Sequence, residues 1–198
     1  MVKALVEQQK GLAIYTVGHS TRSIEEFIEI LKTYNITLLV DIRAVPRSRH
    51  NPQFNKESLL NTLKNYGIKY LPLPDIGGLR HPKKDSINLA LVTSSFRGYA
   101  DFMQTKEFTE NLIKLIVLAK ENCLALMCAE ALPGRCHRNL ISDMLFVRHI
   151  RVLHIINKDN TLTHQLNEVA HVEGTKVSYP LFSSKENPQR TIGDFGTA

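Results

Sequence analysis

The sequence predicts a single α/β domain, with a mostly parallel sheet of about five strands and helices on both faces. The main observation is that short β-rich runs alternate with longer segments of helical period from Ile14 to about Ile156. The length of 198 residues suits one domain with a full core. Hydrophobic residues make up 43% and charged residues 22%, which is an ordinary balance for a globular protein.

Strands are predicted from short apolar runs. The run Thr37–Ile42 is nearly continuous in its apolar residues, which is typical of a strand buried in a parallel sheet. In chain order, the expected strands are Ile14–Val17, Thr37–Ile42, Ile68–Leu73, Cys123–Glu130 and Arg151–Ile156.

Helices are expected between these strands. The first, Ser23–Tyr34, begins with Ser23 and Glu26 at the spacing of a capping box. The second, Lys56–Gly67, ends at a glycine, a common helix stop. The later segments of helical period are a helix in two parts, Tyr99–Thr105 and Lys106–Asn122, and a helix at His137–Ile150.

The remaining segments set the expected domain organisation. Asp75–Gly98 lacks a convincing period and is too long for a plain connection, so it is either a functional lid or a mobile insertion. We find no internal repeat and no second domain. The expected organisation is an N-terminal extension at 1–13, the α/β domain at 14–165, and a C-terminal segment at 166–198 that is partly flexible.

Composition limits the class of protein. The formal net charge of +6 and the pI near 9.3 suggest an anionic partner. No apolar run approaches the ~18 residues of a membrane helix, and the first residues lack the apolar core of a signal peptide. Because the 3 cysteines occur without an export signal, we expect reduced thiols, a cytoplasmic location and no membrane partner.

Reactive side chains collect after the expected strands. In open parallel sheets, ligands bind beyond the carboxyl ends of the strands. The loops at the opposite edge contain almost no reactive residues. The segments at the carboxyl ends are Gly18–Arg22, Asp41–Phe54, Gly77–Lys84, Cys128–Arg138 and the strand residue His154. This asymmetry predicts a site at one edge of the sheet.

Asp41 stands inside an apolar run, where an unpaired carboxylate would be costly to bury. Arg43 follows two residues later, on the same side of a strand. Two interpretations stay open. The pair is either a structural ion pair or a carboxylate that orients a catalytic group or the substrate.

Cys128 ends a strand, and a helix begins about nine residues later. With a helix N-terminus, Arg135 and Arg138 nearby, we expect the pKa of this thiol to be lowered. The design resembles the oxyanion loops of cysteine phosphatases and sulfurtransferases. However, six residues separate Cys128 from Arg135, whereas the phosphatase loop has five. The alternative is a small buried residue at a strand end.

A metal site is a further hypothesis, built on Cys128, Glu130, Cys136 and His137. The ligand types suit a transition metal, but the sequence has no C-x-x-C pair. Adjacent Cys136 and His137 would need unusual backbone geometry to share one ion, and the nearby arginines oppose a cation.

Histidines and cations complete the expected site. His19 and His137 are the histidines best placed for acid–base chemistry, since both lie in strand-end loops. Basic residues in the same loops should give this edge a positive potential. They are Arg43, Arg47, Arg49, Arg80, Lys83 and Lys84.

Several long motifs resemble the bacterial and archaeal family known as domain of unknown function 488. They are "TVGHSTRSIEEF", "LLVDIRAVPRSRHNPQFN", "GGLRHP", "SFRGYADFMQT" and "LMCAEALPGRCHR", and the similarity runs from about Ile14 to His164. The resemblance implies one strand-end site but no particular reaction. The family pattern maps onto Gly18, His19, Ser20, Asp41, Arg43, Pro46, Ser48, Phe54, Gly77, Gly78, Tyr99, Cys128, Glu130, Cys136, His137 and Arg138.

The leading hypothesis is an enzyme that acts, without a cofactor, on a phosphate-bearing substrate such as a nucleotide or nucleic acid. The catalytic candidates are Cys128, Glu130, His137, His19 and Asp41. The substrate-binding candidates are Ser20, Arg43, Ser48, Gly77, Gly78, Tyr99, Arg135 and Arg138.

Three alternatives stay open. The first is a non-catalytic module that binds nucleic acid or a nucleotide. The second is a metalloprotein with Cys128, Cys136 and His137 as ligands. The third is a redox protein in which the two cysteines form a disulfide.

Overall fold

A six-stranded sheet organises the chain. The computed structural model describes residues 11–181, so the predicted extension 1–13 and the C-terminal segment 166–198 lie partly outside the described residues. The strand order is β3-β2-β4-β1-β5-β6; β1 to β5 are parallel, and β6 runs antiparallel to β5. The strands are β1 (Ala13–Gly18), β2 (Leu38–Asp41), β3 (Lys69–Pro72), β4 (Leu124–Cys128), β5 (Arg151–Ile155) and β6 (Thr161–Thr163).

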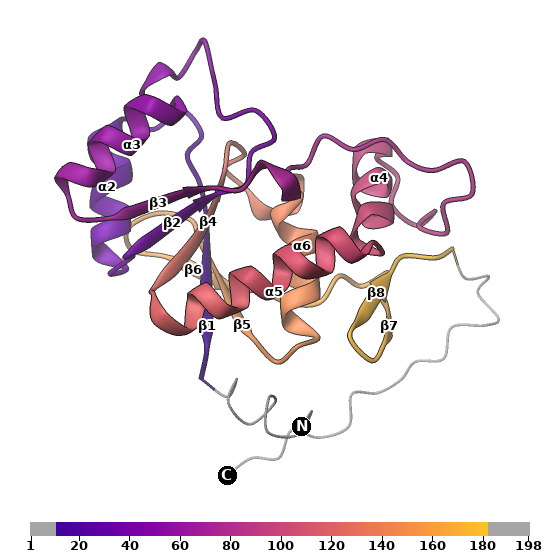
Figure 1. Cartoon of the computed structure of the whole chain (residues 1–198). Helices are drawn as coiled ribbons and strands as arrows, with labels where there is room; N and C mark the ends of the chain where they lie inside the picture. Colours follow the sequence, from indigo (N-terminus) through magenta and orange to yellow (C-terminus); the bar gives the residue numbers. More distant parts are fainter. Residues whose placement is uncertain (1–10, 182–198) are drawn as a thin grey trace.

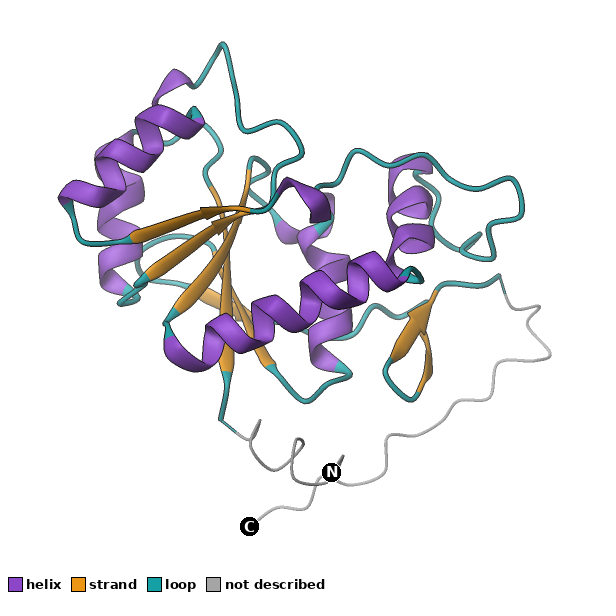
Figure 2. Ribbon diagram, in the orientation of Figure 1, coloured by secondary structure: helices purple, strands orange, loops and turns teal. Residues whose placement is uncertain are grey.

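Helices cover both faces of the sheet, as predicted (Figures 1 and 2). On one face lie α2 (Ile24–Thr33) and α3 (Lys56–Asn65), whose apolar sides form one core. The other face carries α4 (Ser94–Met103), α5 (Lys106–Glu121) and α6 (Arg138–Phe146), which form a second core. We call these the α2–α3 face and the α5–α6 face. Three short 3-10 helices lie in the connections: η1 (Pro52–Phe54), η2 (Pro74–Ile76) and η3 (Pro133–Arg135).

The predicted start of the first helix is confirmed. The Ser23 hydroxyl accepts a hydrogen bond of 3.1 Å from the backbone N–H of Glu26, which satisfies one of the free donors of the first turn. Phe27 and Leu31 are fully buried one helical turn apart. The helix therefore forms where the cap and the apolar period agree.

The segment from Asp75 to Gly98 differs from the expectation. Its last residues are helical, since α4 begins at Ser94. A glycine inside a helix weakens the sequence signal. Gly98 is needed there because a Cβ atom would lie 2.5 Å from the backbone carbon of His81. The helix α4 therefore packs directly against the backbone at His81, and this packing outweighs the low helix propensity of glycine.

A buried carboxylate holds the middle of the same segment in place. Asp101 of α4 accepts hydrogen bonds of 2.7–2.8 Å from the backbone N–H of Lys83, the Ser86 hydroxyl and the Asn88 side chain. Asn88 is itself fully buried and accepts from the backbone N–H of Tyr179. This part of the long connection is thus tied to α4 and to the chain after β8.

A small hairpin lies beyond the main sheet. It joins β7 (His171–Glu173) to β8 (Lys176–Ser178) in antiparallel pairing. Val177 and Tyr179 are fully buried in the core of the α5–α6 face. No helix within residues 11–181 has the length and apolar content that a membrane crossing requires.

The topology marks the place where a ligand would bind. β4 lies between β2 and β1. The helices that follow β1 and β2 pack on the α2–α3 face, whereas α6, which follows β4, packs on the other. Chains that leave neighbouring strands in opposite directions open a crevice at their carboxyl ends.

Candidate functional site

The carboxyl ends of β1, β2 and β4 carry two clusters of polar side chains, one on each face of the sheet. Leu126 and Cys128 lie in the core of the α5–α6 face, while Met127 lies in the other core. Ile42 belongs to the α5–α6 core. Because neighbouring side chains in a strand alternate, Asp41 belongs to the α2–α3 face. The structure therefore separates side chains that the sequence analysis grouped into a single site.

The first cluster is centred on a buried ion pair. Arg43 and Asp41 are 6% and 1% exposed. The Arg43 guanidinium donates from Nε and Nη2 to the two carboxylate oxygens of Asp41, at 2.9 and 2.6 Å. Nη2 also donates to the backbone carbonyl of Phe54 at 2.7 Å, and the Tyr70 hydroxyl donates to Asp41 at 2.6 Å. This network fixes the guanidinium in one orientation.

His19 completes this cluster. Its Nδ1 lies 2.9 Å from the backbone carbonyl of Ser20, which can only accept, so Nδ1 carries the hydrogen. Nε2 is then free to accept from Nη1 of Arg43 at 3.1 Å. The ring stacks on Phe54 with 4.3 Å between centroids. Burial, together with the positive charge of Arg43, lowers the pKa of His19 to about 4. His19 is therefore a neutral acceptor near pH 7.

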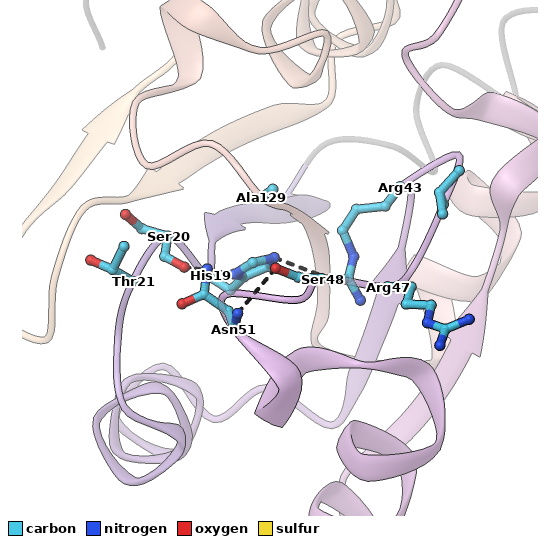
Figure 3. A pocket seen from close by; sticks show the side chains of 9 residues that line it. His19, Ser20, Thr21, Arg43, Arg47, Ser48, Asn51 and Ala129 are labelled. Carbon is cyan, nitrogen blue, oxygen red and sulfur yellow. Dashed lines mark hydrogen bonds between the residues drawn. The ribbon is translucent and has the colours of Figure 1, made fainter.

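A pocket of about 330 Å³ opens beside Arg43 and His19 (Figure 3). Ser20 borders it in the left-handed region with φ of 51°, a strained conformation for a residue other than glycine. Ser48 is held by its neighbours: its backbone N–H donates to Asn55, and its hydroxyl accepts from the backbone N–H of Asn51. We call this the anion pocket, after the ligand class that we propose for it below; its lining residues are His19, Ser20, Thr21, Arg43, Val45, Arg47, Ser48, Asn51 and Ala129.

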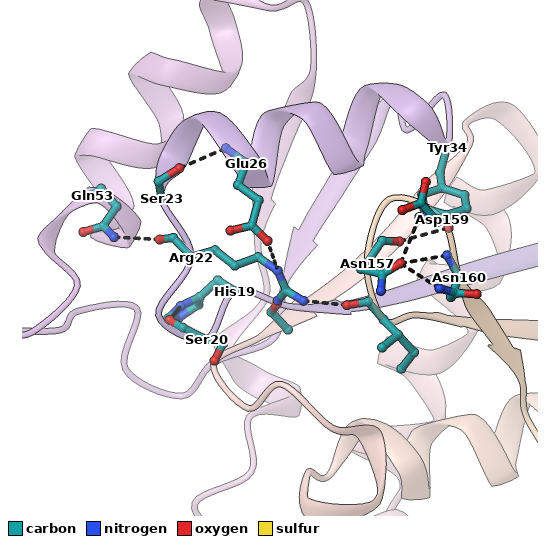
Figure 4. A network of polar contacts seen from close by, with 12 residues as sticks. His19, Ser20, Arg22, Ser23, Glu26, Tyr34, Gln53, Asn157, Asp159 and Asn160 are labelled. Atoms are coloured by element: carbon teal, nitrogen blue, oxygen red, sulfur yellow. Dashed lines mark hydrogen bonds and ion pairs between the residues drawn. The ribbon is translucent and has the colours of Figure 1, made fainter.

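Arg22 holds the loop that forms one wall of the anion pocket (Figure 4). Its guanidinium donates to the backbone carbonyl of Gly18 and, at 2.6 Å, to that of Ile156 after β5. It also pairs with Glu26 at 3.2 Å, while the carbonyl of Arg22 accepts from Gln53. One side chain thus ties the loop after β1 to α2 and to the end of β5.

The second cluster, which we call the thiol cluster, consists of Cys128, Cys136 and His137. Nδ1 of His137 lies 3.9 Å from the Cys128 sulfur and 3.7 Å from the Cys136 sulfur. Nε2 of His137 lies 3.1 Å from the backbone carbonyl of Ile42. All three side chains are buried, and the two cysteines are free thiols.

The pKa shifts in the thiol cluster differ from the expectation. We expected a lowered pKa for Cys128, but hydrogen bonding with Cys136 and burial raise it. The lowered pKa belongs to Cys136, because it accepts a hydrogen bond from Cys128 and lies beside His137 and Arg138. The positive charge of Arg138 acts on both cysteines, but at Cys128 it is outweighed by hydrogen bonding with Cys136 and by burial.

Arg138 is fully buried at the start of α6. Its Nε donates to the Cys136 sulfur at 3.3 Å, and its Nη2 donates to the backbone carbonyl of Glu130. Nη1 lies 3.5 Å from the Thr16 hydroxyl. Arg138 thus holds the loop after β4 together from inside the protein, and it does not line the anion pocket.

The other predicted site residues fall into three places. Glu130 and Arg135 are exposed on the loop after β4. Gly77 and Gly78 directly follow η2; Gly78 packs against His137, since a Cβ there would lie 2.5 Å from Nδ1. Tyr99 is fully buried, donates to the carbonyl of Ile76 and has its ring 5.0 Å from that of His137.

A buried chain of hydrogen bonds runs behind the thiol cluster, and sequence reasoning missed most of it. Thr16 contacts His154 at 2.7 Å, His154 contacts His164 at 3.0 Å, and His164 contacts Asp143 at 2.9 Å. Tyr179 donates to the same carboxylate at 2.6 Å. His154 and Asp143 stand among apolar residues of β5 and α6, which is the signal that could have found them.

Stability is expected to fall at acidic pH because two histidines are buried uncharged. Burial lowers the pKa of His19 to about 4 and, together with the charge of His164, that of His154 to about 3. Both lie below the value of about 6.5 in an unfolded chain. Unfolding therefore takes up protons as pH falls below about 6.5, and His19 alone should cost the fold about 3 kcal/mol by pH 4.

Urea unfolding between pH 7 and pH 4 would measure this loss. The His154→Gln variant should show a flatter pH dependence, whereas His50→Gln, at an exposed position, should follow the wild type. A stability that stays constant from pH 7 to pH 4 would contradict the assignment of neutral, buried histidines.

Comparison with known proteins supports the motif resemblance. The family model described as "Domain of unknown function DUF488" matches residues 23–145, which is more than half of the chain. The matched region includes β2 to β4 and the thiol cluster. No curated protein and no solved structure matches the chain.

Proposed function

The chain belongs to the DUF488 family, and we propose that this member binds a phosphate-bearing ligand, a nucleotide or nucleic acid, in the anion pocket. The observation that carries the proposal is the fixed guanidinium of Arg43 in the wall of an open pocket. A guanidinium has five N–H hydrogens, and two of them are on Nη1. His19 accepts one of these two, which leaves the other for a ligand.

The lining of the anion pocket favours an anion. Arg43 and Arg47 supply positive charge, and none of the nine lining residues is acidic. Ser20, Thr21 and Ser48 supply hydroxyl groups that can donate to phosphate oxygens. Because guanidinium groups bind phosphate through charge-assisted hydrogen bonds, this set suits a phosphate better than a neutral sugar or an apolar ligand.

The size and the position of the anion pocket agree with this ligand class. A volume of about 330 Å³ is at the lower end for small-molecule sites, and it suits one phosphate with the sugar attached to it. The pocket also lies at the carboxyl ends of β1 and β2, beside the crevice where the topology reverses.

The proposal is one of binding and assigns no chemical step to the thiol cluster. Cys128 and His137 lie on the opposite face of the sheet from Asp41 and Arg43. His19 is neutral and accepts from Arg43, so it orients the guanidinium toward the ligand. A chemical step on the bound ligand would need a reactive group of the ligand itself or a water molecule.

Binding should depend on Arg47 and much less on Arg49. Replacing Arg47 with Gln is expected to weaken the binding of inorganic phosphate and of nucleoside monophosphates about tenfold, or ~1.4 kcal/mol, by removing one charge-assisted contact. Arg49→Gln is the matched control, because Arg49 is exposed two residues away and does not line the anion pocket. Isothermal titration calorimetry at fixed ionic strength would measure both.

Two results would overturn the proposal. One is the absence of heat of binding for phosphate, nucleotides and short oligonucleotides with the wild-type chain. The other is an equal loss for Arg47→Gln and Arg49→Gln, which would show a diffuse effect of surface charge rather than a pocket.

A further inference from the structure

We propose that the thiol cluster binds a divalent transition-metal ion of the Zn²⁺ class, with the sulfurs of Cys128 and Cys136 and Nδ1 of His137 as ligands. The three ligand atoms lie within 4.8 Å of one another, and all three residues are buried. The proposal concerns the α5–α6 face and does not depend on ligand binding in the anion pocket.

The hydrogen bond of His137 fixes which ring nitrogen can bind a metal. A backbone carbonyl accepts only, so Nε2, 3.1 Å from the carbonyl of Ile42, carries the hydrogen. Nδ1 then has a free lone pair, and it faces both sulfurs. Histidines that ligate metals almost always donate their other N–H to a carbonyl or carboxylate in this way.

The distances already approach those of a metal centre. In a tetrahedral site with Zn–S of about 2.3 Å and Zn–N of about 2.0–2.1 Å, the sulfur and nitrogen atoms are about 3.5–3.6 Å apart. The observed separations between Nδ1 and the two sulfurs are 3.7 and 3.9 Å. Shifts of a few tenths of an ångström would therefore bring both nitrogen–sulfur distances to those of a tetrahedral site.

The backbone explains how adjacent residues can face one ion. Cys136 is extended, with φ of −134° and ψ of 145°, whereas His137 is helical, with φ of −57° and ψ of −16°. The chain changes direction between them at the start of α6, which brings both side chains to the same side. Because of this turn, the adjacent residues Cys136 and His137 can face one ion with ordinary extended and helical backbone angles.

Arg138 does not oppose the metal, because it donates to a ligand rather than facing the nitrogen. Its Nε and its backbone N–H lie 3.3 and 3.5 Å from the Cys136 sulfur. Hydrogen bonds of this kind stabilise a ligating thiolate and orient it. The buried charge of two thiolates would then be balanced by the cation.

Three protein ligands would leave the fourth position of a tetrahedral ion for an added ligand. Within residues 11–181, no fourth cysteine, histidine or carboxylate joins the three. Gly78 and Tyr99 cover the His137 side of the cluster. Three protein ligands with an open fourth position are typical of metal sites that take water or a substrate.

Cobalt binding to the full chain would test this proposal. After treatment with a chelator, the wild type is titrated with Co²⁺, and the absorption is recorded in the near ultraviolet and the visible. We expect about one Co²⁺ per chain, with a thiolate-to-cobalt charge-transfer band and the visible bands of tetrahedral Co²⁺. Excess Zn²⁺ should displace the cobalt and bleach the bands.

Matched variants identify the ligands. The double variant Cys128→Ser/Cys136→Ser should lose the charge-transfer band, while Cys123→Ser should keep it, because Cys123 precedes β4, at the opposite end of that strand from Cys128. Gly78→Ala should weaken Co²⁺ binding without removing a ligand, since its methyl group displaces the His137 ring. Far-ultraviolet circular dichroism reports whether each variant is folded.

One measurement needs no variant. Zn²⁺ added to the chelator-treated wild type should raise Tm, and a chelator should reverse the rise, because the ion binds the folded state. Absence of both the Tm shift and the charge-transfer band would overturn the proposal, as would a band that survives in Cys128→Ser/Cys136→Ser. Phosphate binding in the anion pocket would be unaffected by either result.

Discussion

Replacing Asp41 with Ala is expected to lower the free energy of unfolding by about 3–5 kcal/mol, because the change leaves the buried guanidinium of Arg43 without its counter-charge. The Asp41 carboxylate accepts from Nε and Nη2 of Arg43, from the backbone N–H of Arg43 and from the Tyr70 hydroxyl. The side chains of Asp41 and Arg43 are 0% and 6% exposed, so water cannot replace these partners. Urea unfolding monitored by circular dichroism would measure the loss.

Two comparisons separate the ion pair from its neighbours. Tyr70→Phe removes a single hydrogen bond to Asp41 and should cost only about 1 kcal/mol. The double variant Asp41→Ala/Arg43→Met should be more stable than the sum of the two single changes implies, because no charge is then left unpaired. Additive losses would show that the two side chains are not energetically coupled.

Among glycine-to-alanine substitutions, Gly18→Ala should cause the largest loss of stability. Gly18 ends β1 beside Cys128, and a Cβ atom there would overlap the backbone carbonyl of Glu130 and lie 3.0 Å from the Cα of Ala131. Both obstacles are backbone atoms, so the loop after β4 has to move. We expect a loss of about 3 kcal/mol or more in the free energy of unfolding.

The same substitution should also disturb the anion pocket, because Ala129 of this loop lines it. Gly134→Ala is the matched control, since a Cβ at Gly134 meets no atom within 4 Å. Thermal unfolding and phosphate titration of the two variants would measure both effects. Equal Tm values for Gly18→Ala and Gly134→Ala would show that the loop after β4 can move aside without a loss of stability.

The sheet and most helices could be predicted because their signals are local. The inner parallel strands are largely buried, so they stand out as apolar runs such as Leu38–Asp41, and only the edge strand β3 is mostly half-buried. The cap at Ser23 is a contact between residues three apart. By contrast, β6 and the hairpin of β7 and β8 have three residues per strand and are partly exposed, so they carry no usable period.

The candidate site could be predicted only in part. The pairing of Asp41 with Arg43 follows from alternation within one strand, and the structure confirms it. The division into two clusters depends on the register between strands, in which Gly18 pairs with Cys128 and Asp41 pairs with Met127. That register is a property of the folded sheet, so no spacing in the sequence reveals it.

The charge of Arg138 shows the same limit. The sequence places Arg135, Arg138 and a helix N-terminus near Cys128. The direction of each arginine side chain, however, comes from the turn into α6. Arg138 folds inward onto Cys136, and Arg135 points outward into solvent. A count of nearby charges therefore predicts a lowered pKa for Cys128, whereas the contacts in the folded protein lower the pKa of Cys136.

The strand order also determines when this protein can fold during synthesis. The centre of the sheet joins β1 to β4, with Tyr15 opposite Ala125, and β4 separates β2 from β1. The earliest strand thus finds its neighbours only after most of the chain has left the ribosome. Contacts so distant in sequence slow folding and leave apolar strands uncovered meanwhile. A nascent chain that stops before β4 should therefore be a substrate for chaperones rather than a partly built domain.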